Sequence, residues 1–360
     1  MAVSPKDIGL EKIEDSIARI RALLQPIRDA RRKIARGRGP DADSGERRVK
    51  AELRQMTMDR LEAEADTPLI VTPGFGTEAH IGERNNILSG EFLEIGILAA
   101  RAVCKISRGV TTGTGFLVGE GVVLTNHHVI EEAGHAREAL FEFLYDDNTI
   151  GTPRNSVAYV ADTDRFFYSD EDLDFCFVAL RQTDGSPALG SFGWLPLLPD
   201  EGKILIGHPV NIIQHPNGLQ KRVVVHDSTF TMIRNGGELD PYCWYSGDTE
   251  SGSSGAPVMN SRWEAIALHH KAVPATDKNG HVLDVDGKLI AKERLDDPDT
   301  RVKWIANEGI RVSRIVGRLK AAALEGGYAE IRERLLQLWS SPLATIEARK
   351  ASYAGMAGQI

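Results

Sequence analysis

The stretch DTESGSSGAPV, from Asp248 to Val258, carries the most information about this chain. It places Ser254 in a Gly-Xaa-Ser-Gly-Xaa-Pro setting, where small residues let the backbone turn sharply and present one hydroxyl. Such a turn leaves the amide hydrogens of Gly252 and Ser254 free to face a developing oxyanion. A serine hydroxyl is a poor nucleophile by itself, so this interpretation requires a base and an orienting acid elsewhere in the chain.

The candidate base follows an apolar run, Val122–Leu124, that predicts a β-strand. Two adjacent histidines, His127 and His128, come just after this strand and before Val129. Catalytic groups are commonly held where a rigid element ends in a loop, which makes this a suitable position for a base. We predict that His128 is the base because it directly precedes the valine, and His127 is the alternative.

The candidate acid lies in SDEDLDFCFVAL. An aspartate that enters an apolar strand is costly unless its charge is paired, and Asp174 directly precedes such a strand. We therefore expect Asp174 to point inward at the base, and Asp170 and Asp172 to be solvated. The order along the chain is then histidine, aspartate, serine, as in one of the known catalytic triads.

These segments together resemble a known family. GTGFLVGEGVVLTNHHVI, DLDFCFVAL and GSSGAPV, with QHPNG and NEGIRVS, are similar to the trypsin-like serine peptidases of the chymotrypsin fold. More narrowly, they resemble the bacterial peptidases related to glutamyl endopeptidases. The resemblance implies two six-stranded β-barrels with the active site between them, and an activity that hydrolyses peptide bonds without a cofactor. It makes Ser254 the nucleophile, His128 the base, Asp174 the orienting carboxylate, and the amides of Gly252 and Ser254 the oxyanion hole.

The resemblance also suggests what the primary pocket prefers. Glutamyl endopeptidases carry Thr or Ser and a His at the positions of Thr249 and His269, so we expect cleavage after Glu, with Gln and Asp as further candidates. The alternative is that His269 is a structural histidine of the core whose hydrogen bonds are satisfied within the protein. Asp248 stands where trypsin keeps its pocket aspartate, and it supports a rival preference for Arg or Lys. The backbone of His270–Ala272 is expected to pair with extended substrate.

Two further expectations follow from single residues. Trypsin has an aspartate just before its serine, which pairs with a newly cleaved N-terminus, and Ser253 cannot supply that charge. We therefore predict no trypsin-style zymogen switch. The paired histidines do not predict a metal site, because adjacent residues on a strand point to opposite faces and form no natural chelate.

The fold class that we predict is mainly β, a chymotrypsin-like double six-stranded barrel with helical extensions at both ends. The peptidase domain is placed at residues 67–320, with the first barrel at about 98–190 and the second at about 200–312. Short β-rich runs between glycine and polar turns begin near residue 100 and agree with this placement. Residues 321–360 are predicted to form a C-terminal helical tail.

Residues 1–66 follow a helical spacing and predict a segment for packing, oligomerisation or regulation. Pro26 is expected to kink or divide the first helix. The second helix presents Val49, Leu53, Met56 and Leu61 on one side. That pattern favours a helical hairpin packed on the main domain, with a coiled-coil or partner-binding segment as the alternative. Self-association or a regulatory partner would act through these helices.

Composition and net charge limit the cellular compartments and the kinds of partner that we expect for this protein. The chain has 360 residues, 42% of them hydrophobic, and a formal net charge of -8, which disfavours nucleic acid as a partner. The basic run ARRKIARGR is accordingly interpreted as a solvated helix end. No apolar run approaches the length of a membrane span, and the first residues contain no apolar signal core. With three scattered cysteines, these features predict a cytoplasmic protein.

Two other classes of function stay open. The first is a regulated or inactive relative that uses the cleft only to hold peptides, although a binding module has no need of all three triad residues. The second is an assembly or sensor subunit in which the helical ends matter most.

Overall fold

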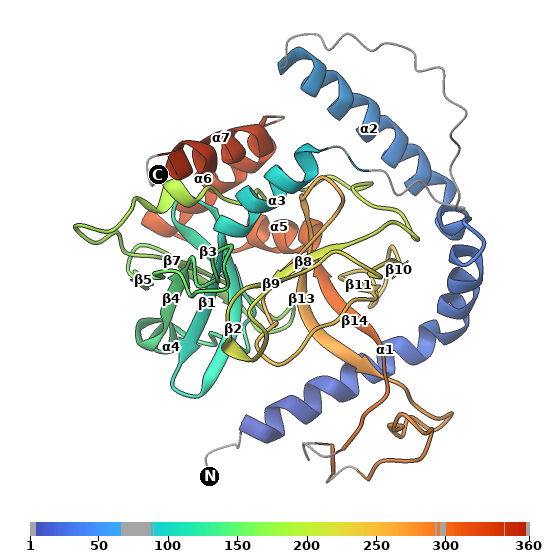
Figure 1. Ribbon diagram of the computed structural model, residues 1–360. Helices are drawn as coiled ribbons and strands as arrows, with labels where there is room; N and C mark the ends of the chain where they lie inside the picture. The colour runs from blue at the N-terminus through green and yellow to red at the C-terminus, as the bar shows by residue number, and fades with distance from the viewer. Residues whose placement is uncertain are drawn as a thin grey trace.

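The computed structural model describes residues 5–65, 88, 90–291, 294–295, 300–341 and 343–357. Two antiparallel β-sheets form its centre, and helices from both ends of the chain pack around them (Figure 1). The predicted boundary at residues 66 and 67 lies outside the described residues.

The first sheet is built from the chain between residues 103 and 179, and its strands lie in the order β5-β4-β1-β2-β3-β7-β6. An isolated bridge between Ala161, directly after β5, and Leu180, directly after β7, closes this sheet into a barrel. A short helix, α4 (Ala133–Glu138), precedes β4. The strands are β1 (Val103–Arg108), β2 (Thr111–Gly119), β3 (Val122–Thr125), β4 (Leu140–Phe143), β5 (Val157–Val160), β6 (Phe167–Asp170) and β7 (Phe175–Ala179).

The second sheet has the order β10-β11-β14-β13-β12-β8-β9. A bridge between Pro209, just before β8, and Thr229, just before β10, closes it in the same way. Two 3₁₀ turns, η2 (Leu189–Phe192) and η3 (Pro216–Gly218), flank the connection to this barrel and its first strand. The strands are β8 (Asn211–Gln214), β9 (Arg222–Val224), β10 (Phe230–Ile233), β11 (Tyr242–Tyr245), β12 (Pro257–Met259), β13 (Ala265–Pro274) and β14 (Trp304–Arg311).

The prediction of a chymotrypsin-like double barrel with helical ends is confirmed. Each sheet has seven strands rather than six, because one strand of each barrel is interrupted. β5 pairs with β4 at one edge of the first sheet, and the next strand in the chain, β6, pairs with β7 at the other edge. In the second sheet, β9 pairs with β8 and the next strand, β10, pairs with β11 in the same way. Counted as one interrupted strand, each pair gives a six-stranded barrel.

Three helices follow the second barrel: the first packs on β13 and β14 of that barrel, the second on β2 of the first barrel, and the third on η2 and on the helix that precedes β1. They are α5 (Val312–Ala321), α6 (Gly326–Ser340) and α7 (Ala344–Ala357). Trp339 of α6 is buried, and its indole Nε1 donates to the carbonyl oxygen of Val118 on β2 at 2.7 Å. Helix α7 contacts η2 and α3 (Glu91–Arg101), and its Ala348 and Ser352 are buried. The C-terminal part is thus helical, as expected, and it packs on the barrels.

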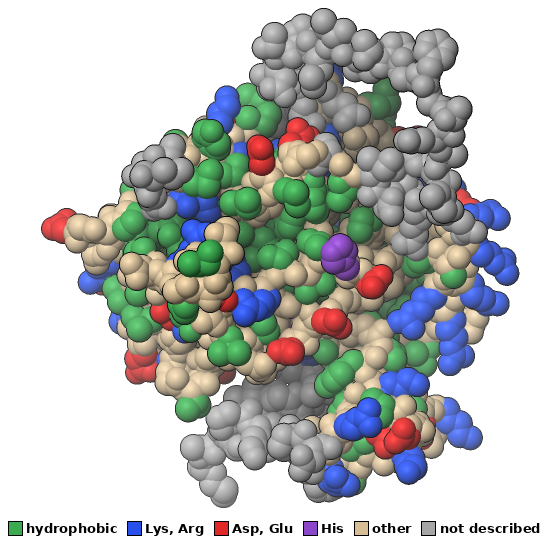
Figure 2. All heavy atoms as spheres, viewed as in Figure 1, with side chains coloured by type: hydrophobic (Ala, Val, Ile, Leu, Met, Phe, Trp, Pro, Cys, Tyr) green, Lys and Arg blue, Asp and Glu red, His purple; other side chains and the backbone are tan. Residues whose placement is uncertain are grey.

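Helix α1 (Pro5–Ile34) runs around the second barrel as a belt (Figure 1). Its buried face presents apolar side chains every three or four residues and lies against β10 and β13. Pro26 does not divide this helix, which continues through it, and the alternative that Pro26 kinks the helix stays a prediction. Figure 2 shows Lys and Arg side chains gathered along the edge that the second half of α1 follows. The buried members of the packed face are Ile17, Ile20, Leu23, Ile27 and Ala30.

Helix α2 (Gly45–Ala65) follows α1 through the 3₁₀ turn η1 (Gly39–Ala42) and continues away from it rather than folding back (Figure 1). Its predicted apolar stripe does not pack on the barrels, since Val49, Leu53 and Met56 are all more than half exposed. The helix is attached by charged contacts instead, including one between Arg54 and the buried Glu264 at 2.9 Å. The hairpin expectation is therefore wrong. Across the described ranges, no helix is long and apolar enough to cross a membrane.

Candidate active site

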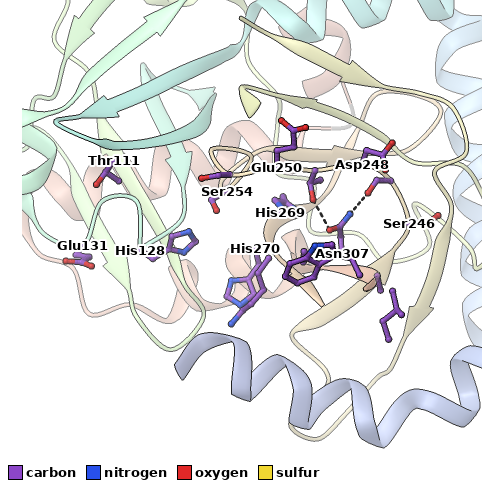
Figure 3. Close-up of a pocket in the computed structure, with 18 of the residues that line it drawn as sticks. Thr111, His128, Glu131, Ser246, Asp248, Glu250, Ser254, His269, His270 and Asn307 are labelled. Atoms are coloured by element: carbon purple, nitrogen blue, oxygen red, sulfur yellow. Dashed lines mark hydrogen bonds between the residues drawn. The ribbon is translucent and has the colours of Figure 1, made fainter. Parts of the chain in front are cut away.

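A cleft of about 1090 Å³ lies between the two barrels (Figure 3). The first barrel and its loops contribute His128, and the second contributes Ser254, so the predicted base and nucleophile face the same space. All four residues predicted to bind substrate also line this cleft. They are Asp248, Thr249, His269 and His270.

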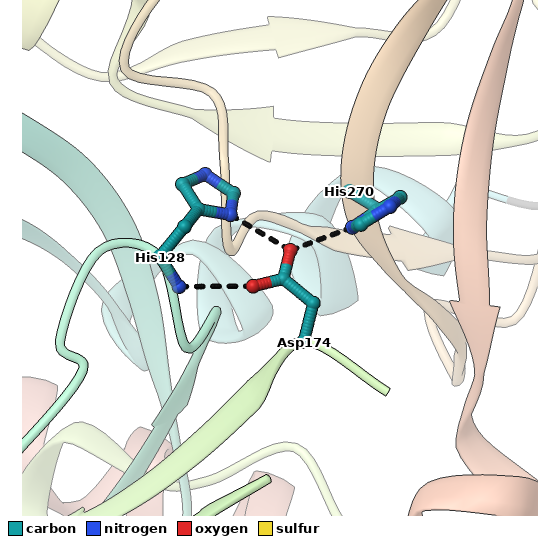
Figure 4. A group of neighbouring side chains, drawn as sticks. All are labelled: His128, Asp174 and His270. Carbon is teal, nitrogen blue, oxygen red and sulfur yellow. Dashed lines mark hydrogen bonds and ion pairs between the residues drawn. The ribbon is translucent and has the colours of Figure 1, made fainter. Parts of the chain in front are cut away.

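His128 and Asp174 are joined by two hydrogen bonds (Figure 4). The backbone amide of His128 donates to Asp174 Oδ1 at 2.9 Å, and His128 Nδ1 lies 2.7 Å from Asp174 Oδ2. Burial raises the pKa of Asp174, but the neighbouring His128 and His270 outweigh it and hold that pKa well below its ordinary value. An ionised carboxylate only accepts hydrogen bonds, so His128 carries its proton on Nδ1. Nε2 is then the nitrogen available as a base.

The turn before β7 fixes the carboxylate of Asp174. This residue has a left-handed backbone with φ of 50°, which Asp tolerates better than most non-glycine residues. The side-chain amide of Asn126 donates to the Asp174 carbonyl oxygen at 2.8 Å. Unusual backbone geometry of this kind is retained where the surroundings over-determine it.

The serine loop depends on two glycines with positive φ, Gly252 at 87° and Gly255 at 85°. A Cβ atom on Gly255 would lie 2.1 Å from the carbonyl oxygen of Thr114, so no side chain fits there. Thr114 ties the loop to the first barrel: its amide donates to the Ser254 carbonyl at 2.8 Å, and its hydroxyl donates to the Gly252 carbonyl at 2.8 Å. The nucleophile loop of the second barrel is therefore held by β2 of the first.

The amides of Gly252 and Ser254 donate to no group in the part of the chain that the structure describes, whereas Ser253 donates to the Glu250 carbonyl at 3.0 Å. The two predicted oxyanion donors are thus available. No hydrogen bond joins Ser254 to His128 among the described residues, although both line the cleft. Bonds between a nucleophile and its base are often long in unliganded sites and tighten only with substrate.

His270 also reaches Asp174. Its Nδ1 lies 2.7 Å from Asp174 Oδ2, the oxygen that His128 uses (Figure 4). This position results from a β-bulge, because His269 pairs with Gly309 while Lys271 pairs with the adjacent Glu308, which leaves His270 as the extra residue. Regular alternation would have turned one of the two histidines away.

The argument from alternation against a metal site concerned adjacent histidines, and it does not apply to His128 and His270, which come from different pairs. Ligand-type atoms of His128, Asp174 and His270 lie within 4.8 Å of one another. The shared carboxylate oxygen explains their closeness through hydrogen bonds alone. The expectation of a metal-free site stays a prediction on this basis.

The pocket beside Ser254 is organised by hydrogen bonds among its own residues. Thr249 Oγ1 donates to Asn307 Oδ1 at 2.9 Å, and Asn307 Nδ2 donates to the Gly247 carbonyl at 2.7 Å. His269 Nδ1 lies 2.7 Å from the hydroxyl of Tyr245. Burial, with His270 and His128 nearby, lowers the pKa of His269 to about 3, so its ring is neutral near pH 7.

Tyr245 determines which nitrogen of His269 carries the proton. Burial raises the pKa of Tyr245 well above its ordinary value, so the hydroxyl keeps its hydrogen. Within the described residues this hydroxyl has no partner except His269, and it therefore donates to Nδ1. Nε2–H of His269 then remains as a donor for a ligand in the cleft. His269 is thus a satisfied buried histidine that also lines the pocket.

Three other predicted residues lie outside this arrangement. His127, the alternative base, is bonded through Nδ1 to Ser169 Oγ at 2.8 Å. Asp170 was expected to be solvated, but its side chain is only 9% exposed and pairs with Arg318 at 3.1 Å. Asp172 is exposed as expected and also contacts Arg318, at 3.2 Å.

Sequence reasoning missed several residues of the site. Asn307 and Glu308 belong to the NEGIRVS segment, which is part of the resemblance to trypsin-like peptidases but whose residues were given no role. Asn126 supports Asp174 and lies in the quoted segment GTGFLVGEGVVLTNHHVI, but it was given no role there; Tyr245 supports His269, and no motif pointed to it. Their roles depend on which strands become neighbours, and a single sequence does not contain that information.

Comparison with known proteins agrees with this geometry. Residues 113–268 match the family model described as "Trypsin-like peptidase domain". This part of the chain is therefore similar to a trypsin-like peptidase domain. Two curated relatives match as well: the uncharacterized protein y4fB of Sinorhizobium fredii is 34% identical over 270 residues, covering 70% of this chain and 40% of the relative. The secreted RxLR effector protein 73 of Plasmopara viticola is 32% identical over 206 residues, covering 52% of this chain and 48% of the relative.

The chain thus spans less than half the length of these two relatives. Among solved structures, the inactive form of the Rv3671c protease of M. tuberculosis matches with 16% identity and a TM-score of 0.39, covering 66% of this chain and 97% of that one. Deg5 matches with 15% identity and a TM-score of 0.41, covering 64% and 94%. The relation to glutamyl endopeptidases has no counterpart among these matches and stays a prediction.

Proposed function

We propose that this protein is a serine endopeptidase that hydrolyses peptide bonds through Ser254, His128 and Asp174. The observation that carries the proposal is the His128–Asp174 pair, which faces the same cleft as Ser254. The trypsin-like peptidase domain over residues 113–268 contains all three residues and supports the same reaction. The amides of Gly252 and Ser254, which donate to no group among the described residues, supply the oxyanion donors that an acyl-transfer site also needs.

The mechanism follows from the protonation states. Ser254 Oγ attacks the substrate carbonyl carbon while His128 Nε2 takes its proton, and Asp174 stabilises the resulting imidazolium. The amides of Gly252 and Ser254 donate to the oxyanion, and each such donor contributes about 3 kcal/mol of transition-state stabilisation. His128 then gives its proton to the departing amine. A water molecule releases the acyl group by the same steps in reverse order.

We infer a preference for Glu, Gln or Asp before the scissile bond. The supporting observation is the neutral His269, whose Nε2–H is a donor for a side-chain carbonyl or carboxylate oxygen. The Thr249 hydroxyl donates its hydrogen to Asn307, so this hydrogen is not available to the substrate. The rival preference for Arg or Lys rests on Asp248, which lines the cleft but is exposed. A water-exposed carboxylate gives a weaker charge interaction than a buried one.

A regulated or peptide-holding module is the second candidate. The observation that favours it is the missing hydrogen bond between Ser254 and His128 in the described structure. The preformed loop argues against a trypsin-style zymogen, because Ser253 is buried and its Oγ accepts from the Glu250 amide at 3.1 Å. We further propose that the protein is cytoplasmic. Its proposed partners are a protein or peptide substrate, a second copy of the chain, or a regulator that acts through the N-terminal helices.

A peptide library tests activity and preference together. The purified chain and its Ser254→Ala variant are incubated with the same peptides, and the products are identified by mass spectrometry. We expect cuts after Glu, Gln or Asp in the wild type, and a loss of about a million-fold in turnover in the variant. A preference for Arg or Lys would refute the role of His269 and support Asp248. Full activity in Ser254→Ala would refute the peptidase mechanism itself.

A further inference from the structure

A continuous set of polar contacts runs from helix α1 to the candidate acid. Ser16 Oγ donates to Glu308 Oε1 at 2.7 Å, and Arg19 contacts the same carboxylate through Nη2 at 2.7 Å and through Nε at 3.1 Å. Glu308 Oε1 lies 3.6 Å from His270 Nε2. His270 Nδ1 in turn lies 2.7 Å from Asp174 Oδ2. Two residues of α1, two of the second barrel and Asp174 in the turn before β7 are thus connected.

Glu308 is the unusual member of this set because its side chain is fully buried on β14. A buried carboxylate is unfavourable unless it is paired and hydrogen-bonded. Arg19 supplies both requirements with two donors, a geometry that fixes direction as well as charge. The guanidinium also lies over the Tyr242 ring, 4.1 Å from its centroid, which limits its movement. α1 therefore completes a site inside the second barrel.

His270 transmits this arrangement to the candidate active site. It lies between two carboxylates, with Nδ1 directed at Asp174 and Nε2 facing Glu308. The bulge that places it here leaves it 5% exposed, so its ring has little room to rotate. Because His270 and His128 share Asp174 Oδ2, a shift of His270 changes the position of the oxygen that orients the base.

We propose that helix α1 is a positioning element of the peptidase site: Arg19 fixes Glu308, Glu308 orients His270, and His270 holds the carboxylate of Asp174 for His128. The inference rests on the proposed serine peptidase function. It assigns to the N-terminal segment a positioning role in catalysis, beyond packing or assembly. Anything that lifts α1 from the second barrel would reduce the reactivity of Ser254 without touching the triad.

The test compares two arginines of the same helix in the full chain. Arg19→Ala removes the cation from Glu308, and Arg19→Lys keeps the charge but loses the two-donor geometry. Arg21→Ala is the matched control, since Arg21 Nη2 donates to the Lys278 carbonyl at 2.7 Å and makes no contact with Glu308 among the described residues. The buried apolar face of α1 is intact in all three variants, and circular dichroism with a thermal melt verifies folding.

The measurement is the rate of Ser254 labelling by a fluorescent fluorophosphonate, separated into the limiting rate and the concentration for half-saturation. We expect Arg19→Ala to lower the limiting rate by about 10- to 100-fold with unchanged half-saturation, because a displacement of about 1 Å can cost that much. Arg19→Lys should recover part of the rate, and Arg21→Ala should match the wild type. A change of the His128 Nδ1–H proton resonance in Arg19→Ala alone would report the displaced base directly.

The outcomes separate this inference from the function on which it rests. If the folded wild type is not labelled at Ser254, the peptidase proposal fails. If the wild type is labelled and both Arg19 variants react at the wild-type rate, the positioning role is refuted and the peptidase proposal stands. If Arg21→Ala loses as much as Arg19→Ala, docking of the whole helix is responsible, and the chain through Glu308 and His270 is refuted.

Discussion

The chain contains two adjacent histidine pairs, one in each barrel, and they are used differently. In the pair after β3, His128 contacts Asp174 while His127 turns away to Ser169. In the pair on β13, both His269 and His270 are buried and line the cleft. The cause is the backbone, because the first pair lies in a turn and the second contains a bulge. Identical dipeptides therefore yield one site residue in the first barrel and two in the second.

The first pair gives the largest expected effect. His128→Ala should lower turnover by about a million-fold, because no other group in the cleft takes the proton of Ser254 in the proposed mechanism. His127→Ala is the matched control and should stay within a few-fold of the wild type. Both are measured as kcat on a peptide taken from the library. Equal losses in the two variants would mean that the pair does not divide its roles as described.

The second pair should show an intermediate effect at His270. His270→Ala removes one of the two histidine contacts on Asp174 Oδ2 and should lower kcat by about 10- to 100-fold through displacement of the carboxylate. KM should change little, since the proposed role is in positioning. A rise in KM with kcat unchanged would instead indicate that His270 acts by binding substrate.

His269 should change selectivity more than rate. His269→Phe keeps a ring but loses Nε2–H, and discrimination in favour of Glu or Gln should fall by about tenfold to a hundredfold, as expected for a hydrogen bond worth roughly 1.5–3 kcal/mol. Tyr245→Phe, which removes the hydroxyl that sets the tautomer of His269, should have a smaller effect in the same direction. Competing peptides in one reaction measure both. An unchanged preference in His269→Phe would contradict the pocket assignment.

The smallest expected effect is on stability: Asp174, which contacts a histidine of each pair, should make the unfolding free energy depend on pH in the acid range. Its folded pKa is lowered, so its contribution to stability is complete above the unfolded pKa of about 4 and is lost as the pH falls through the folded value. The unfolding free energy of the wild type should therefore decline more steeply with acid than that of Asp174→Asn. Denaturant titrations between about pH 2 and 6 measure the difference. Parallel curves would show that the carboxylate is not stabilised as described.

The sequence predicted the fold and the positions of the candidate triad for a common reason. Alternating apolar runs specify strands, and His128, Asp174 and Ser254 each stand at the end of such a run or in a glycine turn, where local sequence determines geometry. Thr249 and His269 were placed in the pocket by resemblance, and the cleft contains both. These features depend on residues close together in the chain.

The remaining features depend on residues far apart. The bulge at His270 arises from the register between β13 and β14, and the contact between Arg19 and Glu308 joins residues 289 positions apart. The apolar stripe of α2 looked like a packing face, yet the exposed Val49, Leu53 and Met56 show that pattern alone does not decide which helix face is buried. Pro26 was expected to kink or divide α1, but the helix is not divided there, and its packing against β10 and β13 supports it.

Covalent labelling tests the central claim most directly. The wild type, Ser254→Ala and Asp174→Asn are each treated with the fluorophosphonate, and the modified residue is identified by peptide mass mapping. The account predicts one adduct on Ser254 in the wild type, none in Ser254→Ala, and a rate lowered by about ten-thousand-fold in Asp174→Asn. Peptide cleavage by a wild-type protein that carries no adduct on Ser254, or wild-type labelling in Asp174→Asn, would contradict it.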